Sequence, residues 1–396
     1  MQYNTIFSQL FHFIPRHRFE KKVKEMNGDR YCKGFTAWIQ FLTCLYAQIT
    51  GKDSLREIEQ GLLVNARRLY HLGMRQAPRS TLSDAMNRRP PEMFESLFDE
   101  VLDRATALAP GHRFKFRNPL YAIDSTTVDM CLGMRSWAKY KTTKGAIKLH
   151  TQLDLAGNIP CFVVMSDGKM SDIHAAREHF RIAPDSIYVY DRGYCDLEWF
   201  ASINAGDAFF VTRLKGNARL EVVGRHSVPP RATGVVSDEV VLFAGAVSGG
   251  KYPAPLRKVV FHDGESGKTY EFLTNNFNIA AATVAAIYRR RWQIELFFKW
   301  IKQNLKIKSF LGTSRNAVMT QIWVALTHYL LVAYIKFLSS TRLTLTVITN
   351  RLREMLMSDF GLMELLKLDR RALEKPPDWN KPRQLMLFGE FLQLKF

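Results

Sequence analysis

The sequence is poor in cysteine, and the few cysteines that it has form no recognisable pattern. The five are scattered along the chain, and no two of them make a CxxC pair. This spacing argues against a structural zinc site, and the odd number argues against a disulfide framework. A reducing compartment suits such a chain, so we expect a cytoplasmic protein.

Long apolar segments are lacking as well. The longest apolar run, residues 322–335, is interrupted by Thr327 and His328 and closed by Lys336. It falls short of the roughly 18 to 20 residues that a membrane-spanning helix needs, and it predicts a buried helix instead. Residues 1–19 show no basic stretch followed by an apolar one, so we expect neither an export signal nor a membrane partner.

Acidic residues are scarce relative to basic ones. The chain of 396 residues has 56 Lys and Arg against 37 Asp and Glu, which gives a net charge of +19. A protein with this excess of positive charge usually binds polyanions. Nucleic acid is the first candidate, and an anionic membrane surface is the second.

The pattern of apolar residues divides the chain into four parts. Residues 1–110 are predicted to form a helical domain that binds DNA or serves as a scaffold, with helices over 35–49, 55–63 and 93–108. Residues 111–213 and 276–312 are predicted to form an α/β core with a mixed sheet. A β-rich insertion over 214–275 interrupts this core. Residues 313–396 are predicted to be helical over 316–338 and 343–357 and loosely structured from 375 onward.

One corner of the N-terminal part has the spacing of a helix-turn-helix. A turn that contains Gly73 separates two helical segments, and Ser80 is predicted to cap the second. If this corner enters a DNA groove, Arg79, Arg88 and Arg89 would contact the DNA. A plain scaffold with a solvated basic face explains the same residues.

Two apolar strands of the core each carry an aspartate. The first strand, over 120–128, contains Asp124, and the second, over 185–191, ends in Asp191. Between them we predict a hairpin (146–155 and 159–165) and a helix (171–180), and after them a helix to residue 205 and a strand over 208–213. A buried, ionised carboxylate is costly unless it is paired or bound to a metal. Either aspartate could also simply cap a helix or accept backbone N–H bonds.

The third acid lies on a predicted helix over residues 281–310. Tyr288, Arg291, Glu295 and Lys302 fall on one stripe of this helix at 3.6 residues per turn. Taken alone, the stripe could be a surface helix with an Arg291–Glu295 pair four residues apart. Together with the two aspartates, Glu295 completes a set of three carboxylates.

Three carboxylates without a nearby set of histidine or cysteine ligands favour hard divalent cations, magnesium or manganese. Two such ions about 4 Å apart can hold the attacking and leaving oxygens of an in-line phosphoryl transfer. We therefore predict that Asp124, Asp191 and Glu295 are catalytic metal ligands. Asp129, five residues after Asp124, is an alternative ligand.

These residues resemble a known family. Tyr288-x2-Arg291-x3-Glu295-x6-Lys302 resembles the Y-R-E-K signature of bacterial insertion-sequence transposases of the insertion-sequence-four family, which are DDE transposases. Asp124 in Tyr121-Ala-Ile-Asp-Ser-Thr-Thr and Asp191 in Asp-Arg-Gly-Tyr194 resemble that family's two catalytic aspartates. The resemblance extends over residues 115 to 340 and implies a ribonuclease-H-like core interrupted by the β-rich insertion.

The resemblance also implies an activity. The protein would cleave DNA at transposon ends and transfer the freed 3′-hydroxyl strand to target DNA, with Mg²⁺ as cofactor and Mn²⁺ as a substitute. It would work in the bacterial nucleoid as a homodimer on paired inverted repeats. A nuclease that cuts without joining and a non-catalytic DNA-binding descendant remain alternatives. DNA contacts are expected at Tyr288, Arg291, Lys302, Arg213, Lys215, Lys299, Lys139 and Lys144.

One residue expected from the resemblance is missing. In relatives that release the flanking strand through a DNA hairpin, a tryptophan of the insertion stacks on a flipped base. No tryptophan lies between Trp199 and Trp292 in this sequence. The candidates to replace it are Phe209, Phe210, Phe243 and Tyr252.

Overall fold

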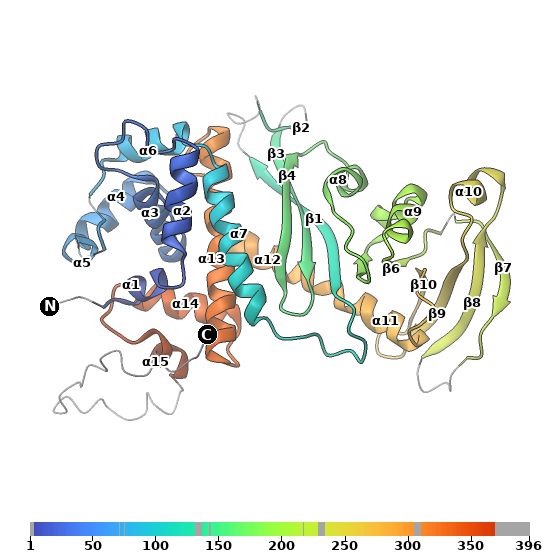
Figure 1. Ribbon diagram of the computed structural model, residues 1–396. Coiled ribbons are helices and arrows are strands. Elements are labelled where there is room, and N and C mark those ends of the chain that lie inside the picture. Colours follow the sequence, from blue (N-terminus) through green and yellow to red (C-terminus); the bar gives the residue numbers. More distant parts are fainter. Residues whose placement is uncertain are drawn as a thin grey trace.

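A computed structural model places the chain as three parts in a row: a helical part, a central sheet and a β-rich end (Figure 1). It describes residues 4–70, 72–74, 76–130, 137–141, 144–216, 218–228, 234–304 and 310–368. The predicted loose tail from residue 375 lies outside these described residues. So do the side chains of Lys139 and Lys144, two of the predicted DNA contacts.

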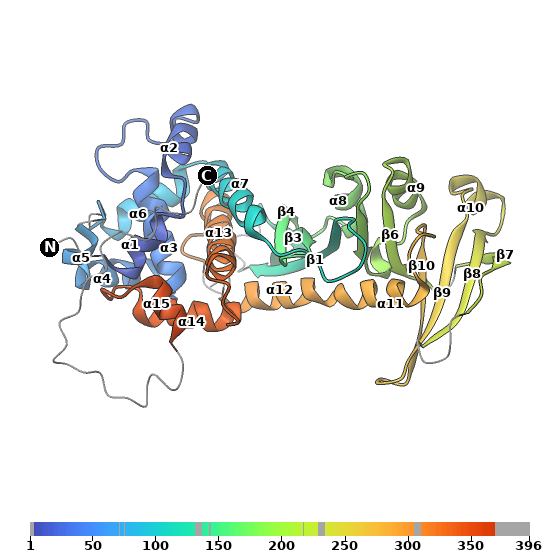
Figure 2. The ribbon, with the colours of Figure 1, turned by 60° about the horizontal axis from the view of Figure 1, so that its bottom comes forward.

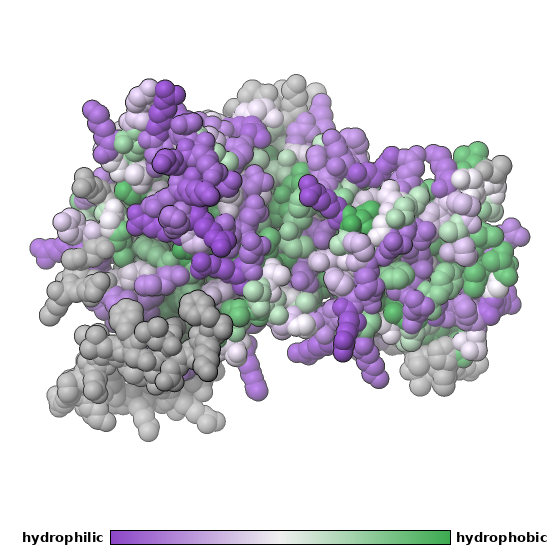
Figure 3. All heavy atoms as spheres, viewed as in Figure 1, coloured by the Kyte–Doolittle hydropathy of each residue, from purple (hydrophilic) through white to green (hydrophobic). Residues whose placement is uncertain are grey.

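The N-terminal helices pack around the long helix α13 (Arg315–Ser339), mainly through α7 and α3. Helix α3 is apolar on every side, and its residues from Ala37 to Ile49 are all buried, as expected for a central helix. Polar side chains cover much of the outer surface of this part (Figure 3). Its described helices are α1 (Ile6–Phe11), α2 (Arg16–Glu25), α3 (Ala37–Thr50), α4 (Leu55–Val64), α5 (Ala66–Tyr70), α6 (Arg79–Arg88) and α7 (Glu92–Leu108).

Helix α13 is the one described helix whose length and composition would allow it to cross a membrane. Of its most apolar window, 89% is buried inside the fold. Its hydrophobic surface is thus occupied by neighbouring helices, including α14 (Leu345–Met355), and α15 (Leu362–Lys367) follows. The predicted buried helix is confirmed.

Two predictions for the N-terminal part are wrong. Helix α6 begins at Arg79 after Pro78, so Ser80 lies inside the helix and does not cap it. Arg89 is 8% exposed, and its guanidinium donates to Gly28 O, Gln40 Oε1 and Asp29 Oδ1. A buried arginine with these partners holds the domain together and cannot reach DNA, whereas Arg79 and Arg88 are exposed.

The core is one mixed sheet. Strand β1 pairs antiparallel with β3, which pairs antiparallel with β4, and on its other side β1 runs parallel to β5 and β5 parallel to β6. This arrangement, with helices in the parallel crossovers, confirms the predicted ribonuclease-H-like core. Its elements are β1 (Leu120–Met130), β2 (Lys139–Lys141), β3 (Lys144–Asp154), β4 (Ile159–Asp167), α8 (Asp172–His179), β5 (Ile187–Tyr190), α9 (Leu197–Ala205) and β6 (Phe209–Arg213).

The insertion continues the same sheet. Strand β10 pairs with β6, and the order continues through β9 and β8 to β7 at the edge. Its elements are β7 (Leu220–Arg225), β8 (Val235–Phe243), α10 (Ala246–Lys251), β9 (Leu256–Asp263) and β10 (Lys268–Thr274). The β-rich prediction is confirmed for the strands, but α10 adds a short helix that the sequence did not indicate.

A buried ion pair fastens the insertion to the core. Arg257 Nε and Nη2 donate to Asp238 Oδ1 and Oδ2 at 2.8 and 2.6 Å, and Arg257 Nη1 donates to Ile279 O at 2.6 Å. The two side chains are 7% and 3% exposed. Since Ile279 lies two residues before α11, this contact ties the segment that leads into that helix to the insertion.

Helices α11 (Ala281–Arg290) and α12 (Trp292–Asn304) run along one face of the sheet, and α8 and α9 cover the other (Figure 2). The single helix predicted over 281–310 is therefore interrupted at Arg291. Around this residue the backbone forms tighter bonds three residues apart, from Arg291 N to Tyr288 O and from Ile294 N to Arg291 O. At this break Arg291 reaches Asp124 of β1.

Candidate active site

The fold brings Asp124 and Asp191 side by side. Strands β1 and β5 are parallel neighbours, and their register pairs Ile123 with Tyr190. The next residue of each strand is an aspartate. Since neighbouring strands lie about 4.8 Å apart, the two carboxylates emerge close together at the point where β5 ends.

Local backbone bonds orient both aspartates. Asp124 Oδ1 accepts a bond from Ser125 N at 2.8 Å. Asp191 caps the short 3-10 helix Arg192–Tyr194, because its Oδ1 accepts from Gly193 N at 2.8 Å. The capping role foreseen as an alternative is thus real for Asp191. It engages one carboxylate oxygen and leaves the other for a different partner.

Glu295 reaches the same place from helix α12, through Arg291. Arg291 Nη1 lies 3.4 Å from Asp124 Oδ2, and Arg291 Nη2 lies 2.5 Å from Glu295 Oε1. Arg291 is 14% exposed, whereas Asp124 and Glu295 are 20% and 33% exposed, so water still reaches both carboxylates. The predicted Arg291–Glu295 pair exists, and it belongs to the acid cluster and not to an open helix surface.

The electrostatics of the cluster disfavour the ionised form of Asp124. Burial raises the pKa of Asp124 to about 6, and the negative charges of Asp191 and Glu295 act in the same direction. The Ser125 N–H and the Arg291 guanidinium oppose the shift. A group of acids that repel one another and share one cation gains stability when more positive charge arrives.

The donor set suits a hard divalent cation, since its oxygens come from carboxylates alone. Within the described residues, no three His, Cys, Asp or Glu side chains are yet close enough to hold one ion together. Arg291 lies between two of the three carboxylates. An ion held by all three would take over the charge compensation that Arg291 provides.

Aromatic rings and a second arginine extend the site toward the insertion. The Arg291 guanidinium lies over the Tyr288 ring at 5.6 Å, and that ring packs on Phe272 at 5.0 Å. Arg213 lies over the neighbouring Tyr270 at 5.0 Å. Burial raises the pKa of Tyr288, while Arg291 and Arg213 oppose the shift. The Tyr288 hydroxyl therefore keeps its proton beside the Arg291 guanidinium, as a donor to an anion would.

The other predicted DNA contacts lie farther out. Lys299 and Lys302 are exposed on α12. Lys215 is exposed just beyond β6, and its Nζ donates to Cys195 O at 2.8 Å. Asp129 is exposed on β1, and its odd spacing from Asp124 puts it on the opposite face of the strand. This position disfavours Asp129 as the alternative ligand.

The structure also corrects the search for a stacking aromatic. Phe210 and Tyr252 are 0% and 2% exposed, so neither can receive a base. Trp292, which directly follows Arg291, is 56% exposed. It lies outside the insertion, where the family resemblance places the stacking residue, so it was not among the predicted candidates. An aromatic residue adjoining an arginine of the helix stripe would have been the signal.

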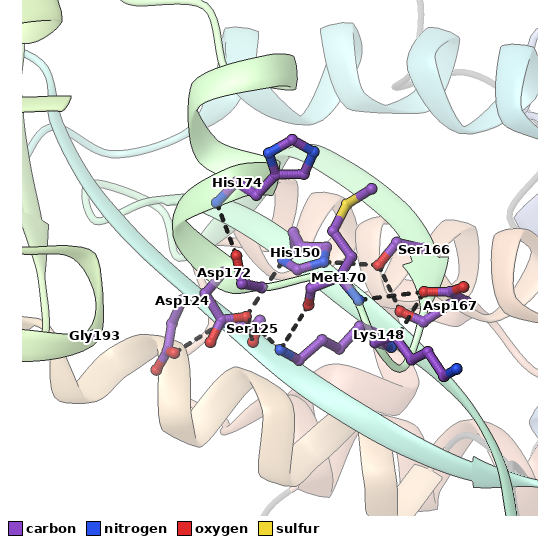
Figure 4. A network of polar contacts seen from close by, with 12 residues as sticks. Asp124, Ser125, Lys148, His150, Ser166, Asp167, Met170, Asp172, His174 and Gly193 are labelled. Atoms are coloured by element: carbon purple, nitrogen blue, oxygen red, sulfur yellow. Dashed lines mark hydrogen bonds and ion pairs between the residues drawn. The ribbon is translucent and has the colours of Figure 1, made fainter. Parts of the chain in front are cut away.

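A further group was not foreseen. Ser125, Lys148 and Asp172 form a polar network behind Asp124, together with the buried His150 (Figure 4). These residues come from three separate elements of the core. Nothing in their spacing along the sequence indicates that they meet.

Comparisons with known proteins agree with this geometry. Residues 115–331 match the family model described as the transposase DDE domain, and residues 2–75 match a domain of unknown function, DUF4372. A protein of Sinorhizobium fredii named as a transposase is 33% identical over 76% of this chain and 81% of its own length. Proteins named as transposases for insertion sequence elements IS5377 of Geobacillus stearothermophilus and IS4SA of Synechocystis are 26% and 25% identical. They align over 65% and 64% of this chain and 67% and 70% of their own lengths.

Among solved structures, a piggyBac transposase synaptic complex with hairpin DNA aligns at a TM-score of 0.42 and 12% identity. The alignment covers 86% of this chain and 73% of that one. This likeness is too weak to inform the site.

Proposed function

This chain belongs to the DDE transposase family of metal-dependent, DNA-cleaving and DNA-transferring enzymes, and we propose that it cuts DNA at the ends of an insertion sequence and joins the freed 3′-hydroxyl strand to a target. One observation carries the proposal: Asp124 and Asp191 leave neighbouring parallel strands at the same level, and Arg291 links Asp124 to Glu295. These are the three acids that the family signature assigns to catalysis.

The three carboxylates would hold the divalent ions, Mg²⁺ or, as a substitute, Mn²⁺. When bound, these ions supply an activated oxygen nucleophile and compensate charge on the leaving oxygen of an in-line displacement. The chain's own part is to fix the ligands. Ser125 N and Gly193 N hold one oxygen each of Asp124 and Asp191, and packing of α12 against β1 brings Glu295 to them.

DNA would lie across the face that carries α11 and α12. Tyr288 and Arg291, with Arg213 beside them, would bind the phosphates next to the cut, and Lys302, Lys299 and Lys215 would bind the backbone farther away. The same role is proposed for Lys139 and Lys144. Trp292 offers an exposed ring on which a base could stack. The net charge of +19 supports such contacts, which position DNA without reading its sequence.

The assembly and setting follow from the reaction. Two ends must be cut and joined together, so we propose a homodimer on paired terminal repeats in the bacterial cytoplasm, at the nucleoid. Membership of the insertion-sequence-four family is part of this proposal, and it rests on the Y-R-E-K spacing of Tyr288, Arg291, Glu295 and Lys302.

The test is incubation of the full chain with DNA that carries the element's terminal repeats, a target plasmid and Mg²⁺. Joined strand-transfer products support the proposal. Nicked ends without joining would identify a nuclease instead. Binding without any cleavage, unchanged in Asp191→Ala, would leave only a non-catalytic DNA-binding protein.

A further inference from the structure

A second polar cluster lies directly behind Asp124, on the other face of strand β1. Consecutive strand residues point to opposite faces, so Asp124 faces α12 while Ser125 faces α8. Ser125 Oγ donates to Asp172 Oδ1 at 2.6 Å, and Lys148 Nζ lies 2.9 Å from the same oxygen. Figure 4 shows Ser125 and Lys148 converging on Asp172.

The cluster joins four elements of the core. Besides β1, it includes Lys148 and His150 of β3, Ser166 of β4 and Asp172 at the start of α8. Lys148 Nζ also donates to Met170 O at 3.1 Å. His150 Nε2 is hydrogen-bonded with Ser166 Oγ at 2.9 Å, but its Nδ1 is 3.6 Å from Asp172 Oδ1, too far for a good bond. Lys148 is therefore the cation that balances Asp172.

Ser125 connects this cluster to the catalytic face. Its side chain is held by Asp172 on one face, and its backbone N–H holds Asp124 Oδ1 on the other. Because both groups belong to one residue, anchoring the hydroxyl also limits how far the N–H can turn. The contacts on the α8 side of the sheet thus help to fix the orientation of the Asp124 carboxylate.

We propose that Ser125, Asp172 and Lys148 are positioning residues that keep the Asp124 carboxylate oriented for divalent-ion binding. The inference rests on the proposed function, in which Asp124 is an ion ligand. None of the three touches the ion or the DNA in this account. They reduce the freedom that Asp124 must lose when an ion binds, which raises ion affinity without adding a ligand.

The competing explanation is that the network only fastens α8 to the sheet. In that case its loss would lower thermal stability and leave the half-saturating concentration of divalent ions unchanged. If the network positions Asp124, its loss should raise the divalent-ion concentration that the protein needs, while the protein remains folded.

The experiment compares the parent chain with Ser125→Ala, Ser125→Thr and a matched control, Ser166→Ala, which removes a hydroxyl that touches His150 and not Asp172. Two quantities are measured against Mn²⁺ concentration: the rate of cleavage of terminal-repeat DNA, and the increase in Tm of the protein without DNA. We expect Ser125→Ala to raise the half-saturating Mn²⁺ concentration roughly threefold to tenfold in both, the size expected from losing one hydrogen bond. Ser125→Thr and Ser166→Ala should stay within about twofold of the parent, as expected of changes that keep that bond.

A folded Ser125→Ala variant with the parent's half-saturating concentration overturns the inference, and so does a Thr variant as impaired as the Ala variant. If Ser125→Ala does not fold, Asp172→Ala carries the test. It removes the oxygen that accepts from the Ser125 hydroxyl, and the same increase is expected. A parent that binds Mn²⁺ but cleaves nothing refutes the proposed function while the Tm readout still tests this inference. A parent that does neither refutes both.

Discussion

Two arginine–carboxylate groups of this protein lie at the same sheet, one within its strands and one between strand β1 and helix α12, and they are built in different ways. In the insertion, Arg257 matches both oxygens of Asp238 with two of its nitrogens and gives the third to a carbonyl. In the acid cluster, Arg291 divides itself between Asp124 and Glu295, and its Nε is buried with no bonding partner among the described residues. The hydrogen bonding of Arg257 is therefore complete at all three nitrogens, and we call it the complete pair. That of Arg291 lacks a partner for Nε, and we call it the incomplete pair.

This difference in hydrogen bonding separates an arginine that holds the fold together from one that could take part in the reaction. Each of the three guanidinium nitrogens of Arg257 already has an acceptor, so a new partner would have to displace a good bond. Arg291 compensates two acids imperfectly, at 3.4 and 2.5 Å. We therefore expect it to exchange them for a phosphate when divalent ions neutralise the carboxylates. We regard Arg257 as a fixed connection and Arg291 as a replaceable one.

The largest effect is expected from loss of one of the three acids of the cluster. Asp191→Ala should lower the rate of DNA-end cleavage by roughly a thousandfold or more, because a lost ion ligand removes several kcal/mol of transition-state stabilisation. DNA binding, followed by gel shift, should remain. Asp129→Ala, an exposed acid on β1, is the control and should cleave at the parent's rate. Near-normal cleavage by Asp191→Ala would exclude this residue as a ligand.

Breaking the complete pair should unfold the protein more easily. Arg257→Met leaves Asp238 buried without a partner, and we expect the free energy of unfolding in urea to fall by about 3 to 5 kcal/mol. The double variant Asp238→Leu/Arg257→Met should recover much of this loss, since no buried charge remains. A loss below about 1 kcal/mol in the single variant, the range of exposed ion pairs, would remove the contrast between the two arginines.

Breaking the incomplete pair should affect activity and not stability. Arg291→Met is expected to lower cleavage about tenfold to a hundredfold, as loss of a phosphate contact worth 1.4 to 2.7 kcal/mol would. Its urea unfolding should stay within about 1 kcal/mol of the parent, because Asp124 and Glu295 are partly exposed and can be solvated. A collapse of Tm would instead show that Arg291 is structural.

Much of the fold could be predicted from the sequence, because it depends on local patterns. The strands that carry Asp124 and Asp191, the hairpin between them and the buried helix α13 all follow from runs of apolar residues. Edge strand β7 and helix α10 did not, since their short polar and glycine-containing segments resemble loops.

The partners within the site could not be predicted. Whether Arg291 bridges two acids, whether Ser125 meets Asp172, and which acid accompanies Arg257 depend on strand register and on the rotamers of residues far apart in sequence. The catalytic roles of Asp124, Asp191 and Glu295 stay predictions. The structure adds the register that puts the first two side by side.

The smallest effect concerns a buried histidine that has no hydrogen-bond partner in the described part of the chain. His328 is buried in α13, neither ring nitrogen has a bonding partner among the described residues, and burial lowers its pKa to about 3. The unfolded chain takes up this proton near pH 6.5, so the folded state loses stability as the pH falls from there toward 3. His328→Leu should shift the midpoint of acid unfolding to lower pH. An unchanged midpoint would mean that other groups govern acid unfolding.

The central claim is that Asp124, Asp191 and Glu295 together hold divalent ions. The most direct measurement is the number of Mn²⁺ ions bound per chain on terminal-repeat DNA, counted by electron paramagnetic resonance. We predict about two ions for the parent, as in two-ion phosphoryl transfer, an unchanged number for Asp129→Ala, and loss of tight binding in Asp191→Ala. Equal ion binding by the parent and a folded Asp191→Ala variant would contradict it.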